Sequence, residues 1–243
     1  MSFLRSLLVS TPLMLIYTAT MWACSMLCSL FDASGNTQHK VAQLWGRLML
    51  SAAFIHVQVE GLEKIQSSGP YVFVSNHASL MDIPAILGKL PYQFRFFAKK
   101  VLYKIPFIGW HLKRAGHVPV ERSNARASLK SMTEGARMVA ERGVSVLLFP
   151  EGGRAPEGLR EFKEGAAYIA IKAGAPVVPM ALIGMRELLP MGTVHLRGGQ
   201  VTLRIGDPIS TAGMKLADRA ALTQRLYEEI SQLLQPAASA EVR

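Results

Sequence analysis

A histidine and an aspartate lie five positions apart at the end of an apolar run, where they could act together as a proton-transfer pair. His77 follows residues 71–75, which read as a short buried strand, and residues 80–87 read as the start of a helix. On one continuous helix, side chains five positions apart diverge by about 140°. Across a turn that opens a helix they can meet, so that Asp82 accepts from one imidazole nitrogen and leaves the other free as a base. The alternative is that Asp82 is only a first-turn acid at a helix N-terminus and His77 a loop residue.

Three further blocks of the sequence combine charged residues with glycine and proline. Residues 149–154 read Phe-Pro-Glu-Gly-Gly-Arg and follow the apolar run 144–148, which predicts a charged turn after a buried strand. Residues 99–109 begin with two lysines and end in glycine, Arg122 follows, and residues 174–179 read Gly-Ala-Pro-Val-Val-Pro. Taken in order, the four blocks resemble the motifs of the glycerolipid acyltransferase family, most closely those of 1-acylglycerol-3-phosphate acyltransferases.

The resemblance runs from about Gly61 to Gly206 and includes two departures from the family pattern. The third motif is usually F-P-E-G-T-R-S, whereas Gly153 and Ala155 replace the Thr and the Ser here. The other motifs match: N-H-x4-D at Asn76, His77 and Asp82; K-x-x-L-x3-P-x2-G ending in Arg at Lys99, Leu102, Pro106, Gly109 and Arg122; and V-x-P at residues 177–179.

The resemblance implies an enzyme that transfers an acyl chain from acyl-CoA or acyl-carrier protein to the sn-2 hydroxyl of 1-acylglycerol-3-phosphate, giving phosphatidic acid. The donor is then a substrate, and neither a cofactor nor a metal is expected. His77 and Asp82 would supply the base, as in a serine-protease dyad in which the substrate hydroxyl takes the place of the serine. No covalent intermediate is required, and the chain contains no G-x-S-x-G nucleophile motif.

The phosphate of such an acceptor calls for fixed cations. Arg154 can present a guanidinium fork to phosphate oxygens, and the N–H groups of the neighbouring glycines can add to an anion-binding turn. Glu151 would hold Arg154 in place or bind a glycerol hydroxyl. The predicted substrate-binding residues are Lys99, Lys100, Arg122, Glu151, Gly152, Gly153 and Arg154. The alternatives are a surface salt bridge for the arginine and a solvated face for the two lysines, of which we expect only one to bind phosphate.

Two other functions stay open. The same chemistry on another lyso-lipid or glycerol-derived acceptor fits the first motif, which does not select the acceptor. A non-catalytic domain that binds membrane lipid is the second alternative, and the intact His77 and Asp82 count against it. Acyl-chain length, the choice of donor and the oligomeric state are not predicted.

The charge of the chain favours an anionic partner. The 243 residues carry a formal net charge of +10, which suits nucleic acid, a phosphorylated metabolite or an acidic membrane surface. Residues 95–122 hold seven Lys or Arg residues and one acid. Residues 94–110 also include six Phe, Tyr or Trp residues. This mixture fits lipid headgroups as well as base stacking. Because no RNP, zinc-finger or KH-type signature is present, we expect membrane lipids and no nucleic acid.

The N-terminal segment favours a membrane. Residues 6–31 contain no formal charge over 26 positions, which as a helix is about 39 Å and exceeds a hydrocarbon core of about 30 Å. The run is too long for a signal peptide, so we expect an anchor in the inner or cytoplasmic membrane, with the catalytic domain facing the cytoplasm. Pro12 weakens the helix, and spanning or lying in one leaflet both stay open. We expect Cys24 and Cys28 to serve as small apolar side chains and not as a metal-binding pair.

The remaining pattern predicts one α/β domain with a mixed, mostly parallel sheet flanked by helices, after an N-terminal membrane-associated helical segment. We expect anchoring helices over residues 1–55, the acyltransferase domain over 56–235 and a flexible tail over 236–243. The helical repeat at residues 41–52 is either an interfacial helix, which we favour, or a core helix. Expected strands cover residues 56–60, 71–75, 144–149 and 176–183, with a hairpin at 194–196 and 200–205; expected helices cover 125–142, 164–173 and 217–234.

Overall fold

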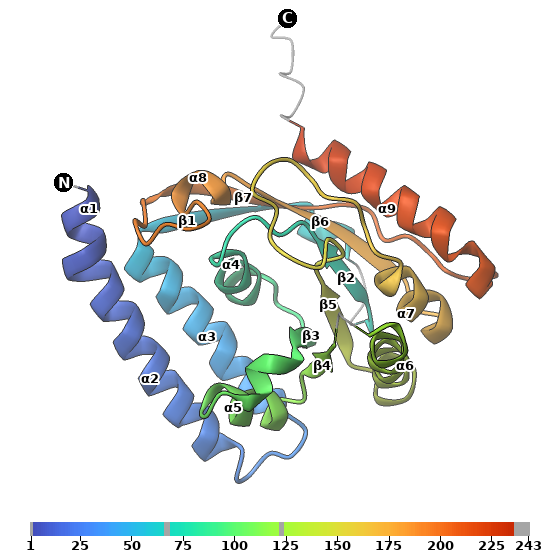
Figure 1. Cartoon of the computed structure of the whole chain (residues 1–243), viewed down its shortest axis with the longest axis horizontal. Helices are drawn as coiled ribbons and strands as arrows, with labels where there is room; N and C mark the ends of the chain where they lie inside the picture. Colours follow the sequence, from blue (N-terminus) through green and yellow to red (C-terminus); the bar gives the residue numbers. More distant parts are fainter. Residues whose placement is uncertain (1, 66–68, 122–123, 236–243) are drawn as a thin grey trace, which may run out of the picture.

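The computed structural model describes residues 2–65, 69–121 and 124–235, and within them the chain is built on one seven-stranded sheet (Figure 1). Its strands are β1 (Ile55–Glu60), β2 (Val72–Ser75), β3 (Phe94–Lys99), β4 (Val118–Val120), β5 (Ser145–Leu148), β6 (Val177–Ile183) and β7 (Gly199–Ile205). The strand order is β1-β7-β6-β2-β5-β3-β4. Strands β2 to β6 run parallel, whereas β7 is antiparallel to β6 and β1 is parallel to β7. The predicted fold class, a mixed and mostly parallel sheet, is confirmed.

Helices cover both faces of this sheet (Figure 1). The α-helices are α1 (Ser2–Arg5), α2 (Thr11–Cys28), α3 (Asn36–Ala53), α4 (Asp82–Lys89), α5 (Ile108–Arg114), α6 (Ala125–Arg142), α7 (Gly165–Ala173), α8 (Met185–Leu188) and α9 (Arg219–Leu234). Phe73 of β2 packs into the core with α3 and α4, whereas Val72 and Val74 pack into the core with α6, α7 and α9. Successive strand residues point to opposite faces, so β2 is buried on both sides, as a central parallel strand must be.

A close helix crossing fixes the position of α4. At Gly46 of α3, an added Cβ would lie 2.6 Å from the Pro84 carbonyl oxygen and 2.7 Å from the Gly88 nitrogen, both in α4. Only glycine permits so close an approach of two backbones. Since α4 begins at Asp82, this crossing sets the distance of that aspartate from the sheet.

The N-terminal helix runs from Ser2 to Cys28 and is long and apolar enough to cross a membrane. Residues 6–10 form a π-turn in which the Thr11 N–H donates to the Ser6 carbonyl oxygen. Pro12, which has no N–H, lies in the first turn of α2, and the wider turn before it spares an ordinary helical hydrogen bond. The helix therefore continues through the proline that the sequence suggested would weaken it.

Both ends of this helix are attached to the rest of the protein. Near its start, the Ser6 hydroxyl accepts from the Leu196 N–H at 2.9 Å. Near its end, the Trp22 indole N–H donates to the Phe107 carbonyl oxygen at 2.9 Å. Between them, α2 lies along α3 (Figure 1). The N-terminal helix is thus packed against one side of the fold.

Three sequence expectations need correction. No hairpin forms, because residues 194–196 are not a strand: their backbone bonds to Ser6, while β7 pairs with β1 and β6. The helix α3 is a core helix and not an interfacial one, since Leu50 and Ala53 are buried against α4 and the sheet. Arg95 is not at the surface. It is 2% exposed in β3 and donates to the Ser34 carbonyl oxygen.

The sequence interpretation also missed β3, β4 and α5, all within the basic, aromatic stretch, and the short helix α8. The other expected strands and helices are present within one or two residues of the predicted bounds. The predicted tail, residues 236–243, lies outside the described residues.

Candidate active site

The carboxyl ends of the parallel strands meet at one edge of the sheet. The chain leaves β2 at Ser75 and β5 at Leu148, two strands that are direct neighbours. The chain then reaches β3 on the far side of β5 and β6 on the far side of β2. In open α/β sheets, such a point is where loops diverge and a crevice forms for ligands. The His77 turn and the 149–154 turn both begin there.

His77 and Asp82 are in direct contact. The imidazole Nδ1 lies 2.8 Å from Asp82 Oδ2, and the same oxygen accepts the N–H groups of Ala78 at 2.7 Å and Ser79 at 2.8 Å. Asp82 is fully buried, whereas 15% of the His77 side chain is exposed. The turn that opens α4 therefore joins two side chains that a continuous helix would keep apart.

This geometry determines which imidazole nitrogen can act as a base. An ionised carboxylate only accepts hydrogen bonds, so Nδ1 carries the hydrogen that points at Asp82. The other nitrogen, Nε2, then has a free lone pair. Among the described residues, no hydrogen bond to Nε2 is formed. The site thus presents one oriented proton acceptor, Nε2 of His77, on a ring that is held by a buried carboxylate.

The 149–154 turn holds the histidine from the other side. The Phe149 ring stacks on the imidazole, with centroids 4.1 Å apart and planes at 17°. The His77 N–H donates to Glu151 Oε1 at 2.7 Å, and the Ala155 N–H donates to the His77 carbonyl oxygen at 2.8 Å. The backbone and the ring of His77 are both fixed as a result.

Glu151 is hydrogen-bonded to the backbone of two loops. It is 5% exposed, and its second oxygen, Oε2, accepts the Arg160 N–H at 3.1 Å. Both oxygens are therefore occupied by backbone groups, and among the described residues Glu151 forms no ion pair with Arg154. Burial raises the pKa of the Glu151 carboxyl, while the two backbone donors oppose that rise. The contacts make Glu151 a brace between two loops.

The glycines beside it shape the turn. Gly152 has φ 72°, in the left-handed region that favours glycine. A Cβ there would also lie 3.1 Å from the Lys163 side chain. Gly153 and Arg154 follow on the half-exposed surface of the turn. Within the described residues, no acidic side chain lies within salt-bridge distance of the Arg154 guanidinium, so it is available to an anion.

The remaining predicted cations are less well placed by the structure. Lys99 is the last residue of β3 and Lys100 begins the 3₁₀ turn that follows it; both are exposed. In the described structure neither side chain is hydrogen-bonded to His77. Arg122 lies outside the described residues.

Residues that sequence analysis did not assign to the histidine's support are Phe149, through its ring, and Ala155, through its N–H. A partial signal existed for Phe149, because it ends the apolar run of a strand whose neighbour leads into His77. No signal existed for Ala155, whose contribution is a backbone group. In the described part of the chain, no group of three His, Cys, Asp or Glu side chains is arranged to hold a metal.

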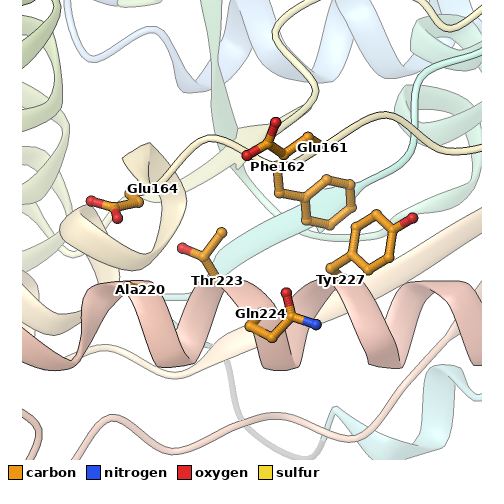
Figure 2. A pocket seen from close by; sticks show the side chains of 7 residues that line it. All are labelled: Glu161, Phe162, Glu164, Ala220, Thr223, Gln224 and Tyr227. Atoms are coloured by element: carbon orange, nitrogen blue, oxygen red, sulfur yellow. The ribbon is translucent and has the colours of Figure 1, made fainter.

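A hollow of about 370 Å³ lies elsewhere, between residues 161–164 and α9 (Figure 2). Figure 2 shows the carboxylates of Glu161 and Glu164 on one side of it and Gln224 and Tyr227 on the other. It contains none of the motif residues. Because the hollow lacks the motif residues, it is not the candidate site.

Comparisons with known proteins point to the same part of the chain. The sequence model of a family described as Acyltransferase matches residues 56–183, which include His77, Asp82 and the whole 149–154 turn. A chloroplastic 1-acyl-sn-glycerol-3-phosphate acyltransferase of Brassica napus is 38% identical over 174 residues, 70% of this chain and 50% of that protein. A 1-acyl-sn-glycerol-3-phosphate acyltransferase of Chlamydomonas reinhardtii is 38% identical over 207 residues, 84% of this chain and 60% of that protein.

The overall fold is also found in a solved structure. The crystal structure of the 1-acyl-sn-glycerophosphate (LPA) acyltransferase PlsC from Thermotoga maritima has a TM-score of 0.79 and 28% identity. The match covers 96% of this chain and 95% of that one, whereas the chain spans only half to three fifths of the two relatives above. The family match covers more than half of the sequence and includes the residues that build the site, and the chain therefore belongs to the acyltransferase family.

Proposed function

We propose that this protein transfers an acyl chain from a thioester donor to the sn-2 hydroxyl of 1-acylglycerol-3-phosphate, giving phosphatidic acid. The observation that carries the proposal is the oriented His77, whose Nδ1 is bonded to the buried Asp82 and whose Nε2 is free of described hydrogen bonds. The printed names of the two relatives and of the Thermotoga maritima protein support the choice of acceptor.

The reaction follows from the position of that nitrogen. His77 Nε2 takes the proton of the acceptor hydroxyl as its oxygen attacks the thioester carbonyl, and Asp82 stabilises the imidazolium that forms. The tetrahedral intermediate then collapses, the C–S bond breaks, and the imidazolium returns its proton to the leaving thiolate. An ester and a thiol result, and no enzyme group is acylated. No cofactor or metal is required by this proposal.

Binding of the acceptor depends on its phosphate. Arg154, which forms no ion pair with the described residues, lies on a glycine turn that is joined to the His77 loop through Glu151. Arg122 with one of Lys99 or Lys100 would add charge. The fixed separation between this turn and His77 would aim the sn-2 hydroxyl at Nε2. The thioester carbonyl is common to acyl-CoA and acyl-carrier protein, and both remain donors in the proposal. Another lyso-lipid acceptor is the alternative.

We further propose that the N-terminal helix, Ser2–Cys28, lies in one leaflet of the membrane. Both of its ends are hydrogen-bonded to the body of the protein, and a helix of about 40 Å that crossed the bilayer would need its two ends on opposite sides. The outer face of the helix exposes large apolar side chains, among them Leu8, Leu15 and Leu27. Burial of this face in the acyl region would hold the enzyme at the membrane that contains its lipid substrate.

Replacement of His77 by alanine should lower kcat by about 10²–10⁴ or more, because the general base is lost. Asp82→Asn should also lower kcat strongly, since the amide cannot stabilise the imidazolium. The measurement is initial-rate kinetics in detergent, with circular dichroism to verify folding. His56→Ala, at an exposed position of β1, is the matched control and should keep full activity. Retention of more than a tenth of the wild-type rate by His77→Ala would contradict the proposal.

Glu151→Gln should lower kcat by about 10–100-fold and leave the acceptor KM unchanged. The amide can still accept the His77 N–H, but it cannot also accept from Arg160, so the loop shifts and His77 is displaced. Glu157→Gln, an exposed change in the same loop, should have no effect. If KM rose and kcat stayed constant, Glu151 would instead contact the acceptor.

Arg154→Ala should cost about 2–4 kcal/mol in kcat/KM for 1-acylglycerol-3-phosphate, the value of a charge-assisted bidentate contact. Arg154→Lys should restore only part of it. A monoacylglycerol, which lacks the phosphate, should be a poor acceptor and nearly indifferent to Arg154→Ala. The exposed Arg197 supplies the control variant Arg197→Ala.

The two acceptors and two proteins form a cycle that isolates the contact. Equal losses on both acceptors would show that Arg154 acts on the donor or on the fold. The choice of a phosphate-bearing acceptor would then lose its chemical support, while the His77 result would still stand.

The single-leaflet placement predicts that both ends of the N-terminal helix face the same side. In a background with Cys24→Ala and Cys28→Ala, cysteines introduced by Ser2→Cys and by Phe31→Cys should both react with an impermeant thiol reagent added outside sealed vesicles. Lys130→Cys, on the exposed face of α6, serves as the reference. Protection of one end, released by detergent, would show that the helix spans the bilayer.

A further inference from the structure

A groove of about 420 Å³ lies between the end of α2 and α5, apart from the motif residues. Apolar and aromatic side chains form most of its lining, and two cations lie at one side. The lining residues are Trp22, Met26, Ser29, Leu30, Trp110, Lys113 and Arg114. Its volume is within the range of pockets that hold small molecules, about 300–1,000 Å³.

Hydrogen bonds between the two helices preform the groove. Besides the bond from the Trp22 indole to the Phe107 carbonyl oxygen, Ser25 Oγ lies 2.9 Å from His111 Nδ1. The rings of Trp22 and Phe107 meet edge to face, with centroids 4.9 Å apart. Since these contacts join the end of α2 to α5 and to the residue before it, the two walls of the groove are held together without a ligand.

The rim of the groove exposes aromatic rings. Phe107 has φ 67°, which is rare for a residue with a side chain. It is 55% exposed beside Trp110, which is 57% exposed. Leu30 is 69% exposed at the end of α2. Exposed tryptophan beside leucine is typical of the boundary between acyl chains and headgroups.

The two cations of the groove form no ion pair with the described part of the chain. Lys113 and Arg114 are both exposed, and among residues 2–65, 69–121 and 124–235 no acidic side chain lies within salt-bridge distance of either. Asp32, the acid of the turn after α2, is bonded instead to the N–H groups of Ser34 and Thr37. The positive charge of the groove is therefore not neutralised by the described part of the chain.

We propose that this groove binds one anionic phospholipid of the membrane, with the lipid phosphate on Lys113 and Arg114 and an acyl chain along Trp22, Met26 and Leu30. The proposal rests on the lining of the groove and on its two cations, and neither on acyl transfer nor on the membrane placement of the N-terminal helix. A free phosphate would use only the two cations and leave the apolar lining in water. A lipid satisfies both parts, since its charged and apolar ends are joined as they are in the groove.

The bound lipid would be distinct from the acceptor. None of the residues that line the groove belongs to the His77 turn or to the 149–154 turn. Its effect would be to strengthen the junction of α2 with α5, and so to hold the body of the enzyme in a fixed orientation at an acidic membrane.

Quenching of tryptophan fluorescence by brominated lipids tests the proposal, because two of the three tryptophans of the chain line the groove. The full-length protein in neutral detergent micelles is titrated with brominated phosphatidylglycerol and, separately, with brominated phosphatidylcholine. We expect saturable quenching by the anionic lipid, with an apparent Kd at least tenfold lower than for the zwitterionic lipid. Excess inorganic phosphate should not displace it.

The variant Lys113→Ala/Arg114→Ala should weaken binding of the anionic lipid at least tenfold and binding of the zwitterionic lipid, whose choline offsets the phosphate charge, much less. The control Lys130→Ala/Lys215→Ala removes the same charge from exposed positions elsewhere and should bind like wild type. Equal binding of the two lipids, an unaffected Lys113→Ala/Arg114→Ala variant, or an equal loss in the control would overturn the proposal, and displacement by phosphate would show a free-anion site.

Two further samples separate this proposal from the others. His77→Ala should bind the anionic lipid like wild type, so failure of acyl transfer leaves the groove standing. The second sample is the protein mixed with vesicles of either lipid. If it binds phosphatidylglycerol in micelles but associates with neither kind of vesicle, the membrane placement of the N-terminal helix is contradicted and the groove is not.

Discussion

One buried carboxylate organises the active site. Asp82 accepts three hydrogen bonds on a single oxygen, from the His77 ring and from the N–H groups of Ala78 and Ser79, while Oδ1 is buried without a described hydrogen-bond partner. Removal of a charge from water costs several kcal/mol, and a hydrogen bond to a charged group contributes about 1.5–3 kcal/mol. The three bonds together can offset that cost, so the turn 77–82 and the ionised carboxylate stabilise each other. The orientation of the imidazole is a consequence, because the ring hydrogen is one of the three donors.

The rest of the fold keeps that arrangement in place at two levels. The Gly46 crossing fixes the helix that starts with Asp82, and the neighbouring strands β2 and β5 bring the 149–154 turn against His77. The contacts between the ends of β2 and β5 join residues more than seventy positions apart in the sequence, as in the hydrogen bond from His77 to Glu151. A parallel sheet allows this because the ends of adjacent strands lie side by side, however distant they are in the chain. The catalytic pair is therefore local in sequence, whereas its support is not.

That difference explains what the sequence could and could not predict. The His77–Asp82 contact follows from a spacing within one turn, and the alternation of buried strands and helices predicts the sheet. Glu151 was expected at the substrate because its neighbours Gly152 and Arg154 suggest an anion site; only the packing of two strands shows that its oxygens bind backbone. The segment 194–196 resembled a strand, but its partner is Ser6, near the other end of the chain. Strand β3 was read as a basic surface, because nothing local indicates that the turn at Ser34 covers Arg95.

The departures of the third motif become understandable once its role as a support is recognised. Ala155 stands where relatives of the family pattern carry a hydroxyl residue, yet its bond to the His77 carbonyl oxygen comes from a backbone N–H and is independent of the side chain. Its methyl group is 1% exposed, so a buried hydroxyl there would need an acceptor of its own. The left-handed position of the turn is taken by Gly152, which matches the pattern. The motif can thus lose two hydroxyl groups and still hold the base through the Phe149 ring, the Glu151 carboxylate and the Ala155 N–H. Arg154 forms none of these contacts, so its guanidinium is the part of the turn that can bind a substrate.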